Sequence, residues 1–491
     1  GLLSLLALTE AVGEALADAP LRLDVVTSGG QDATGGDLRR PEQATVAGVV
    51  RVAPLERPKW TVRWIDADPD DSGSGSAGVA APGTAAPGTA APGTAALVAE
   101  ISRHEWPDVV ALRRGRRWHQ VFEPAPLPAD APAAIRSGGR YLVTGGFGRV
   151  GSALAEHLAG HQARLILLSR TALPPREQWA RLSGEDSATG RAVGLMQRLE
   201  QAGAQVWHFA ADVTDPAQLS QVRDRVVAEL GGLDGIVHAA RLPDTGLVAG
   251  SRLVEAQAEL GPKLAGTLAL RAVFGELPMD FVALNSSVAA IAGGLGRTDD
   301  SAANAFLDAY ARAGIGWRAR LVSVTWGAWR EDEVPDHDGI APAAAVAAWH
   351  RALAAGLDGQ VAIGAYPVAE VIGYERRIAA SIATGPTNST VAVAAAGDLT
   401  GTVARIWREV LGASEVGPDD DFFHLGGTSL VAAQLVLRVR QAVGVRLSMR
   451  VLFEGPTVAS MVARIEALRA GSPVREAEAP IPRLARPGRP A

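Results

Sequence analysis

The sequence of 491 residues predicts an α/β protein with a doubly wound parallel sheet, followed by a small all-α unit. Three observations predict this fold class. From Gly138 to about Tyr374, short apolar runs alternate with helix-length segments, the pattern of parallel β–α units. A glycine-rich turn directly follows the first apolar run. Beyond residue 398 the apolar period changes to that of amphipathic helices.

The composition narrows the class of protein. The length exceeds the roughly 100–200 residues of one domain, so several domains are expected. A net charge of −6 offers no basic surface for nucleic acid. No apolar run reaches the roughly 18 residues of a membrane span, so no membrane partner is expected. The absence of cysteine is compatible with the cytoplasm, where we expect the protein. The first residue, Gly1, indicates a piece of a longer polypeptide.

Residues 1–124 predict a separate α/β layer. Helix and strand patterns alternate here, but no glycine cluster follows the first strand pattern, at 21–30. Residues 71–96 contain three copies of AAPGT, which cannot bury enough apolar surface to fold and therefore predict a flexible loop. The proline-rich residues 125–137 predict a stiffer linker.

The regular part of the chain, residues 138–380, predicts the main sheet. Apolar strand runs occur at 141–146, 164–170, 205–213, 235–240, 281–287 and 321–329. Their alternation with helices predicts a ligand crevice at the carboxyl ends of the strands. Residues 381–397 read as a second linker, 398–470 as a helical bundle, and 471–491 as a disordered tail.

The first strand run leads into TGGFGRVG, residues 144–151, which predicts a dinucleotide-binding turn. Its glycines allow the backbone to approach a pyrophosphate, and the N-terminus of the next helix favours the negative charge. The second strand ends in Ser169 and Arg170 rather than in an acidic residue, which favours NADP over NAD. A solvated arginine is the alternative interpretation. The residues expected at the cofactor are Thr144, Gly145, Gly146, Phe147, Gly148, Arg149, Val150, Gly151, Ser169, Arg170, Asp212, Val213, Ala239 and Ala240.

These motifs carry a family resemblance. In order along the chain they are TGGFGRVG, LLSR, ADVTD, GIVHAA, NSS and SAANAFLDA. Residues 138–374 thereby resemble the ketoreductase domain of type I polyketide synthases, a member of the short-chain dehydrogenase/reductase superfamily. Residues 1–124 resemble the truncated, cofactor-free structural half that precedes such domains. The resemblance implies a Rossmann-like didomain that uses NADPH to reduce a β-ketoacyl thioester.

The resemblance also implies a catalytic set with one departure. Ser287, Lys263 and Asn304 fall on the family's serine, lysine and asparagine, but Asp300 falls on its tyrosine. An ordinary aspartate is ionised at neutral pH and cannot donate a proton to an alkoxide. Three interpretations stay open: a silent reductase, a buried Asp300 that is protonated and acts as the acid, or another group that substitutes. Tyr310 is a poor substitute because ten helical residues place it about 15 Å along the axis.

Two further features bear on the reductase. Family members with one stereochemical outcome often carry Leu-Asp-Asp where this chain has Pro243, Asp244 and Thr245, so the stereochemistry is left open. The acidic residues 331–338 read as a solvated lid loop. The nine histidines show no metal-ligand spacing, and no bound metal is expected.

The second strong motif is DDDFFHLGGTSLVAAQL, residues 419–435, with LFEGPTVASM at 452–461. A serine after two glycines opens a helix, and by itself this could be a simple N-cap. The whole pattern resembles an acyl carrier protein, a small four-helix bundle. The resemblance implies that Ser429 carries 4′-phosphopantetheine, whose phosphate the helix N-terminus would stabilise.

The two resemblances together imply the C-terminal part of a type I polyketide synthase, a multifunctional transferase of secondary-metabolite or antibiotic biosynthesis. The carrier would hold acyl-thioester polyketide intermediates, and the reductase fold would bind NADPH with little or no reduction. A scaffold in which only the carrier is functional is an alternative, and epimerisation is a third option that Asp300 weakens. Implied partners are ketosynthase and acyltransferase domains and a phosphopantetheinyl transferase, with oligomerisation through the parent synthase.

Overall fold

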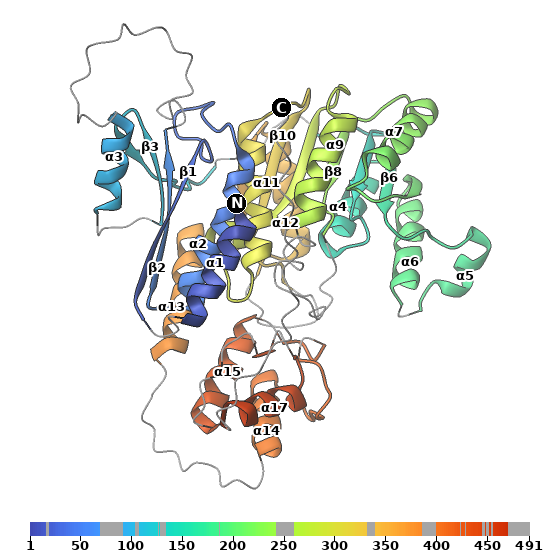
Figure 1. Cartoon of the computed structure of the whole chain (residues 1–491). Helices are drawn as coiled ribbons and strands as arrows, with labels where there is room; N and C mark the ends of the chain where they lie inside the picture. The colour runs from blue at the N-terminus through green and yellow to red at the C-terminus, as the bar shows by residue number, and fades with distance from the viewer. Residues whose placement is uncertain are drawn as a thin grey trace, which may run out of the picture. The chain divides into compact units, whose positions relative to one another are not determined.

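The computed structural model describes residues 1–15, 19–68, 92–103, 108–125, 127, 134–185, 187–241, 260–330, 339–384, 399–422, 424–427, 429–443, 447, 451–452 and 455–469. It divides into two compact units, Gly1–Ala383 and Thr384–Ala491 (Figure 1). Most of the AAPGT loop, Pro243 to Thr245, the acidic residues 331–338 and the tail lie outside the described residues. Within the described part of the chain, no helix has the length and apolar character needed to cross a bilayer.

The larger sheet of the first unit is parallel throughout and has seven strands, in the order β11-β10-β9-β8-β5-β6-β7. The order reverses between β5 and β8, which makes this the switch point where such sheets bind ligands. The predicted doubly wound α/β class is confirmed. Each of the six expected runs contains a strand, and the short edge strand β11 was not expected. The strands are β5 (Arg140–Thr144), β6 (Arg164–Ser169), β7 (Gln205–Ala210), β8 (Gly235–His238), β9 (Phe281–Ser287), β10 (Arg320–Trp326) and β11 (Gly359–Ile363).

Helices cover both faces of this sheet. Successive strand residues point to opposite faces, so Tyr141 and Val143 belong to one core and Leu142 to the other. The Tyr141 face packs against α4 (Arg149–Ala159), α6 (Ala188–Gln201) and α12 (Pro342–Ala354). The Leu142 face packs against α7 (Pro216–Leu230), α9 (Gly266–Phe274) and α11 (Thr298–Ala313). Shorter or peripheral elements are η3 (Arg176–Gln178), α5 (Trp179–Leu182), η4 (Gly261–Ala265), α10 (Ala289–Ala292) and α13 (Val368–Thr384).

The smaller sheet has the order β1-β2-β3-β4. Its strands β1 (Leu21–Ser28), β2 (Trp60–Ala67) and β3 (Val109–Arg113) are parallel, and β4 (Arg116–Trp118) returns antiparallel to β3. Its helices include α1 (Leu2–Ala15), η1 (Pro41–Val46) and α2 (Ala47–Glu56). Helix α3 (Pro92–Ile101) begins inside the expected 71–96 loop, because proline is well suited to the first position of a helix.

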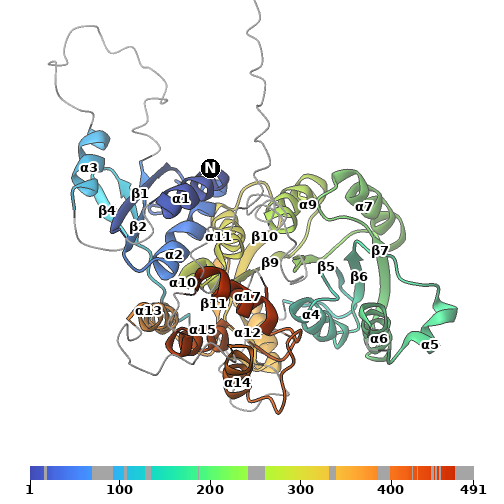
Figure 2. The ribbon, with the colours of Figure 1, turned by 60° about the horizontal axis from the view of Figure 1, so that its bottom comes forward.

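Helix α11 joins the two halves of the first unit. It lies with α1 and α2 between the two sheets in both views (Figure 2). Its residues Ala302, Ala305 and Ala309 belong to the core shared with α1 and α2. A side chain at Gly48 of α2 would put its Cβ 2.3 Å from the Thr298 carbonyl oxygen, so this close approach requires glycine. The smaller half therefore helps to fix the position of α11.

The second unit is helical where it is described. Its helices are α14 (Leu399–Leu411), α15 (Ser429–Val443) and α17 (Val458–Arg469). Trp407 and Phe422 are fully buried and meet edge to face, with ring centroids 5.3 Å apart. Met461 and Ile465 of α17 are buried as well. This small core closes the loop that precedes α15.

Candidate active site

The turn from β5 into α4 forms a cradle at the switch point. Gly145 has a φ of 67°, and a Cβ there would lie 2.4 Å from the carbonyl oxygen of Ala239. The turn is therefore restricted to glycine at this position. Gly148 precedes the first turn of α4, whose free N–H groups can receive a phosphate. Phe147 lies beside His208 of β7, with ring centroids 5.6 Å apart.

His238 connects this cradle to the segment that carries Lys263. Its Nε2 lies 3.1 Å from the Pro262 carbonyl oxygen, which can only accept a hydrogen bond. In the neutral ring, Nδ1 then accepts the hydroxyl proton of Thr144, 2.7 Å away. Burial, opposed by the Pro262 bond and reinforced by the Lys263 charge, lowers the pKa of His238 to about 4. A neutral histidine thus fixes the distance between the cofactor turn and Lys263. From the sequence, His238 was placed at the crevice, but this role was missed.

The other expected cofactor residues lie at the same edge of the sheet. The Ser169 hydroxyl donates to the Thr171 carbonyl, so it can accept a hydrogen bond from His208 Nε2 at 2.8 Å. Arg170 is exposed, and within the described residues its guanidinium makes no ion pair. One carboxylate oxygen of Asp212 accepts hydrogen bonds from the backbone and hydroxyl of Thr214, both at 2.8 Å. Arg170 is therefore available for a ligand phosphate, whereas Ser169 already has partners in the protein.

Lys263, Asp300 and Asn304 meet in one hydrogen-bonded group. Lys263 Nζ donates to Asp300 Oδ1 at 2.9 Å and to Asn304 Oδ1 at 3.0 Å. Asn304 Nδ2 donates to the same Asp300 oxygen at 2.8 Å. Lys263 lies in the π-helical segment Gly261–Ala265, a feature frequent at functional sites. The structure thus brings together three of the four residues that the family resemblance assigned to catalysis.

Asp300 is held as a carboxylate. Arg297 Nη2 lies 2.6 Å from Asp300 Oδ2, so both oxygens contact a cation. Burial alone would raise the pKa of Asp300, but the charges of Lys263 and Arg297 outweigh burial and hold the pKa far below its usual range. The position in the first turn of α11 also favours a negative charge. The site therefore contains an ion pair where a proton donor would be needed.

Ser287 and Tyr310 lie apart from this group. Ser287 ends β9, and its Oγ accepts a hydrogen bond from the Ala289 N–H at 3.3 Å. Within the described residues, Ser287 makes no hydrogen bond to Lys263 or Asp300. The Tyr310 hydroxyl points to the Ile315 carbonyl at 3.5 Å, beyond the far end of α11. Tyr310 therefore does not replace the missing phenol.

The carrier motif begins a helix, as its sequence predicts. Helix α15 starts at Ser429, shortly after Gly426, which has a φ of 86°. The Gly427 N–H donates to the Phe422 carbonyl at 2.9 Å, and a Cβ at Gly427 would lie 2.2 Å from the Phe422 ring. The double glycine therefore lets the chain pass over a buried ring immediately before Ser429.

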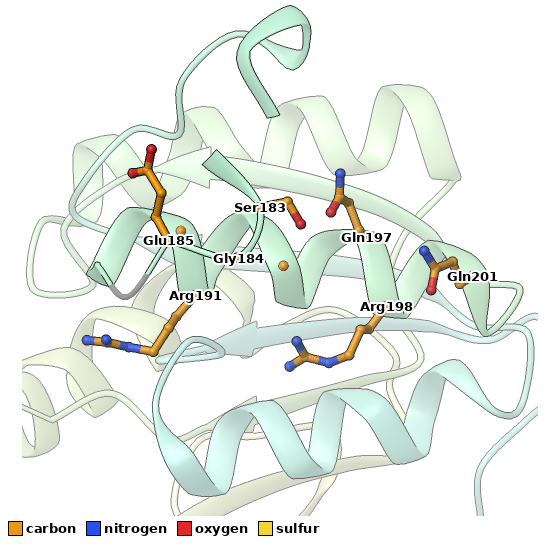
Figure 3. Close-up of a pocket in the computed structure, with 9 residues that line it drawn as sticks. Ser183, Gly184, Glu185, Arg191, Gln197, Arg198 and Gln201 are labelled. Atoms are coloured by element: carbon orange, nitrogen blue, oxygen red, sulfur yellow. The ribbon is translucent and has the colours of Figure 1, made fainter. Parts of the chain in front are cut away.

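A hollow of about 460 Å³ lies elsewhere, along α6 (Figure 3). Polar and charged side chains dominate its rim, among them Glu185, Arg191 and Arg198. Its residues come from α6 and the turn before it, and none belongs to the carboxyl end of a strand. This hollow is consequently separate from the crevice that holds Lys263 and Asp300.

Two parts of the chain match known families. Residues 139–331 match the family model described as the KR domain. Residues 401–465 match the one described as the phosphopantetheine attachment site. The first range contains Lys263, Asp300 and Asn304, and the second contains Ser429.

Similar proteins are polyketide synthases. One of them, from the phenolphthiocerol/phthiocerol polyketide synthase of Mycobacterium tuberculosis, is 31% identical over 363 residues, which cover 68% of this chain and 19% of that protein. The 6-methylsalicylic acid synthase of Aspergillus terreus is 37% identical over 193 residues, covering 39% and 11%. A structure of A-type ketoreductases from a modular polyketide synthase aligns with a TM-score of 0.57 and 28% identity, covering 73% and 71%. The chain thus spans about a fifth of the first relative's length.

Proposed function

Because the chain carries a KR-family ketoreductase domain followed by a phosphopantetheine carrier domain, we propose that it is a polyketide synthase segment whose ketoreductase is silent. Ser429 carries the 4′-phosphopantetheine arm, and the arm holds a β-ketoacyl chain as a thioester. The ketoreductase fold binds NADPH and receives this chain. The β-keto group leaves unreduced, because the site has no acid to protonate the alkoxide.

The cofactor part of this proposal rests on the cradle between β5 and α4. Gly145 fits a turn that tolerates no side chain, and α4 offers its N-terminus to a diphosphate. Arg170 is exposed at the end of β6, where the 2′-phosphate of NADP is expected. NADPH would supply hydride when bound. The protein's own residues only orient it and balance its charge.

The observation that carries the proposed silence is the contact of Asp300 with Lys263 and Arg297. Hydride transfer to the β-carbon leaves an alkoxide that must take a proton from a donor in the site. A carboxylate held between two cations has no proton to give, and its charge repels the developing oxyanion. Lys263 is neutralised by the same contact, so less of its positive charge is available to that oxyanion.

The other interpretations are less well supported by these contacts. A protonated Asp300 would require its pKa to rise toward neutrality, whereas the two cations shift it in the opposite direction. Epimerisation beside the carbonyl also needs an acid or base at this position, and it meets the same obstacle. A scaffold that has lost its cofactor gives no reason for the retained cradle at Gly145.

Two measurements on the whole chain test the proposal. NADPH fluorescence should report saturable binding, and a β-ketoacyl thioester surrogate should give no NADPH oxidation above the rate without enzyme. Clear turnover by the wild-type protein would refute the silence. Absence of NADPH binding would instead favour the scaffold.

Further partners follow from the proposed carrier. They are the ketosynthase and acyltransferase domains of the parent synthase, which load and extend the chain, and the phosphopantetheinyl transferase that modifies Ser429. Oligomerisation through the parent synthase belongs to the same proposal. We place this chemistry in the cytoplasm, where NADPH and acyl thioesters are available.

A further inference from the structure

Three histidines meet on the face of the main sheet opposite α11. His157 lies in the last turn of α4, His161 follows just after that helix, and His350 lies on α12. One ring nitrogen of each lies within 4.8 Å of the others. His157 Nε2 and His350 Nδ1 are 2.8 Å apart, and the three ring centroids are 5.0 to 5.4 Å apart. All three side chains are half-buried.

This arrangement is close to the geometry of a metal site. Zinc binds imidazole nitrogen at about 2.0–2.1 Å, so tetrahedral ligand nitrogens lie about 3.3 Å apart. The 2.8 Å contact and the 4.8 Å limit bracket that separation, and small side-chain rotations would reach it. Half-burial leaves a route for the ion and a fourth position for water.

The surroundings hold the ligands in place. Trp349, next to His350 on α12, is fully buried and meets the His157 ring edge-on, with centroids 6.2 Å apart. Leu158, beside His157, is fully buried in the same core. Burial and the neighbouring imidazoles lower the pKa of His157 to about 4, so its ring is neutral at neutral pH and can offer a lone pair.

We propose that His157, His161 and His350 form a site for a divalent transition metal of the zinc type, which fastens the C-terminal end of α4 to α12. Imidazole ligands suit zinc, copper, nickel and cobalt far better than magnesium or calcium. The site takes no part in the chemistry at Lys263. Its effect is on stability, because α4 is the helix whose other end forms the cofactor cradle.

The test uses the full chain made without a histidine tag and treated with a chelator. Titration with zinc chloride should show binding of one ion per chain by calorimetry, and saturating zinc should raise the melting temperature by about 2–5 °C. Cobalt chloride should give the visible absorption of a tetrahedral nitrogen site. X-ray absorption of the zinc form should count three imidazole ligands.

Two variants separate this site from incidental binding. His161→Gln, outside the helix, and His350→Gln should each weaken zinc binding at least about 10-fold and abolish the thermal shift, with circular dichroism unchanged. His119→Gln is the matched control, because His119 is exposed and outside the cluster, and it should bind zinc like the wild type. Equal zinc affinity in all these proteins, or no stoichiometric binding by the wild type, would overturn the proposal. If either cluster variant unfolds, the ligand count on the wild-type zinc form decides.

Discussion

Lys263 Nζ lies 2.9 Å from Asp300 Oδ1. In the family that this chain resembles, that lysine lowers the pKa of a tyrosine, whereas here it forms an ion pair. The positive charge that would assist a proton donor is instead balanced by a carboxylate. The rest of the reductase site can therefore be intact while its central step is missing.

Replacing Asp300 with tyrosine should restore reduction. In Asp300→Tyr the phenol lies next to Lys263, whose charge lowers its pKa and prepares it to donate a proton. NADPH oxidation with a β-ketoacyl thioester surrogate should rise at least about 100-fold above the wild type, within the range that general acid catalysis supplies.

Two controls accompany this variant. Asp300→Asn removes the negative charge without adding an acid, so it should stay inactive. Tyr310→Phe in the Asp300→Tyr background should leave the restored rate unchanged, because the Tyr310 hydroxyl points to Ile315. Restoration by asparagine would show that charge repulsion, rather than the missing proton, limits the wild type.

Replacing Arg170 with alanine should weaken NADPH binding selectively. The exposed guanidinium is expected to bind the 2′-phosphate, and loss of such a charged contact weakens binding about 10-fold or more. Fluorescence titrations with NADPH and NADH measure the preference. The control Arg181→Ala removes an exposed arginine of α5 and should change neither affinity. An equal loss for both cofactors would count against a 2′-phosphate contact.

Replacing Ser429 with alanine should abolish modification of the carrier. The whole chain, incubated with coenzyme A and a phosphopantetheinyl transferase, should gain the mass of one phosphopantetheine. Ser429→Ala should gain none, while Ser414→Ala, an exposed serine of the same unit, should react like the wild type. Modification of Ser429→Ala would show that the arm is attached elsewhere.

Replacing Gly48 with alanine should destabilise the first unit. The new Cβ would lie 2.3 Å from the Thr298 carbonyl oxygen, and overpacking of this kind costs about 1–3 kcal/mol. Urea unfolding followed by tryptophan fluorescence measures the loss. Gly194→Ala in α6 is the control, since its Cβ meets only Arg198 Nη1 at 3.6 Å, and a gain of about 0.5–1 kcal/mol is expected. Equal effects would mean that α2 can move away from α11.

Asp308 should make stability depend on pH. Burial raises its pKa to about 6 from an ordinary value of 3.8, although hydroxyl groups, including that of Ser323 at 2.6 Å, favour the charged form. The folded state therefore holds this proton more tightly than the unfolded state. The associated stability is complete below about pH 4 and is lost as the pH rises through 6.

The Asp308→Asn variant isolates this contribution. Relative to the wild type, it should gain about 3 kcal/mol in the free energy of unfolding between pH 4 and pH 7, because its amide does not titrate. Urea unfolding at several pH values gives this difference. A difference that does not change with pH would contradict the raised pKa.

Much of the fold could be predicted from the sequence because buried parallel strands give apolar runs of the right length. Strand β11 was missed because it lies at the edge and is short and only partly buried. The pairing of Asp300 with Asn304 follows from one helical turn. Contacts that depend on tertiary folding, such as Arg297 with Asp300 and Thr144 with His238, left no pattern to read.

The histidine cluster shows the same limit. His157 and His161 are spaced by one helical turn, which is a metal-ligand spacing that we did not weigh. The third member, His350, lies far along the chain and reaches the cluster only because α4 and α12 cover the same face of the sheet. One half of this site was therefore visible in the sequence, and the other half required the topology.

The position of α11 has a consequence for exchanging ketoreductase units between synthases. One side of this helix packs on the main sheet, and its alanine side packs on α1 and α2. A recombination junction placed between residues 124 and 138 would separate α11 from the surface that supports it. The exposed apolar strip would promote aggregation of the transplanted half. A transferable cassette must therefore begin before α1 and include both halves.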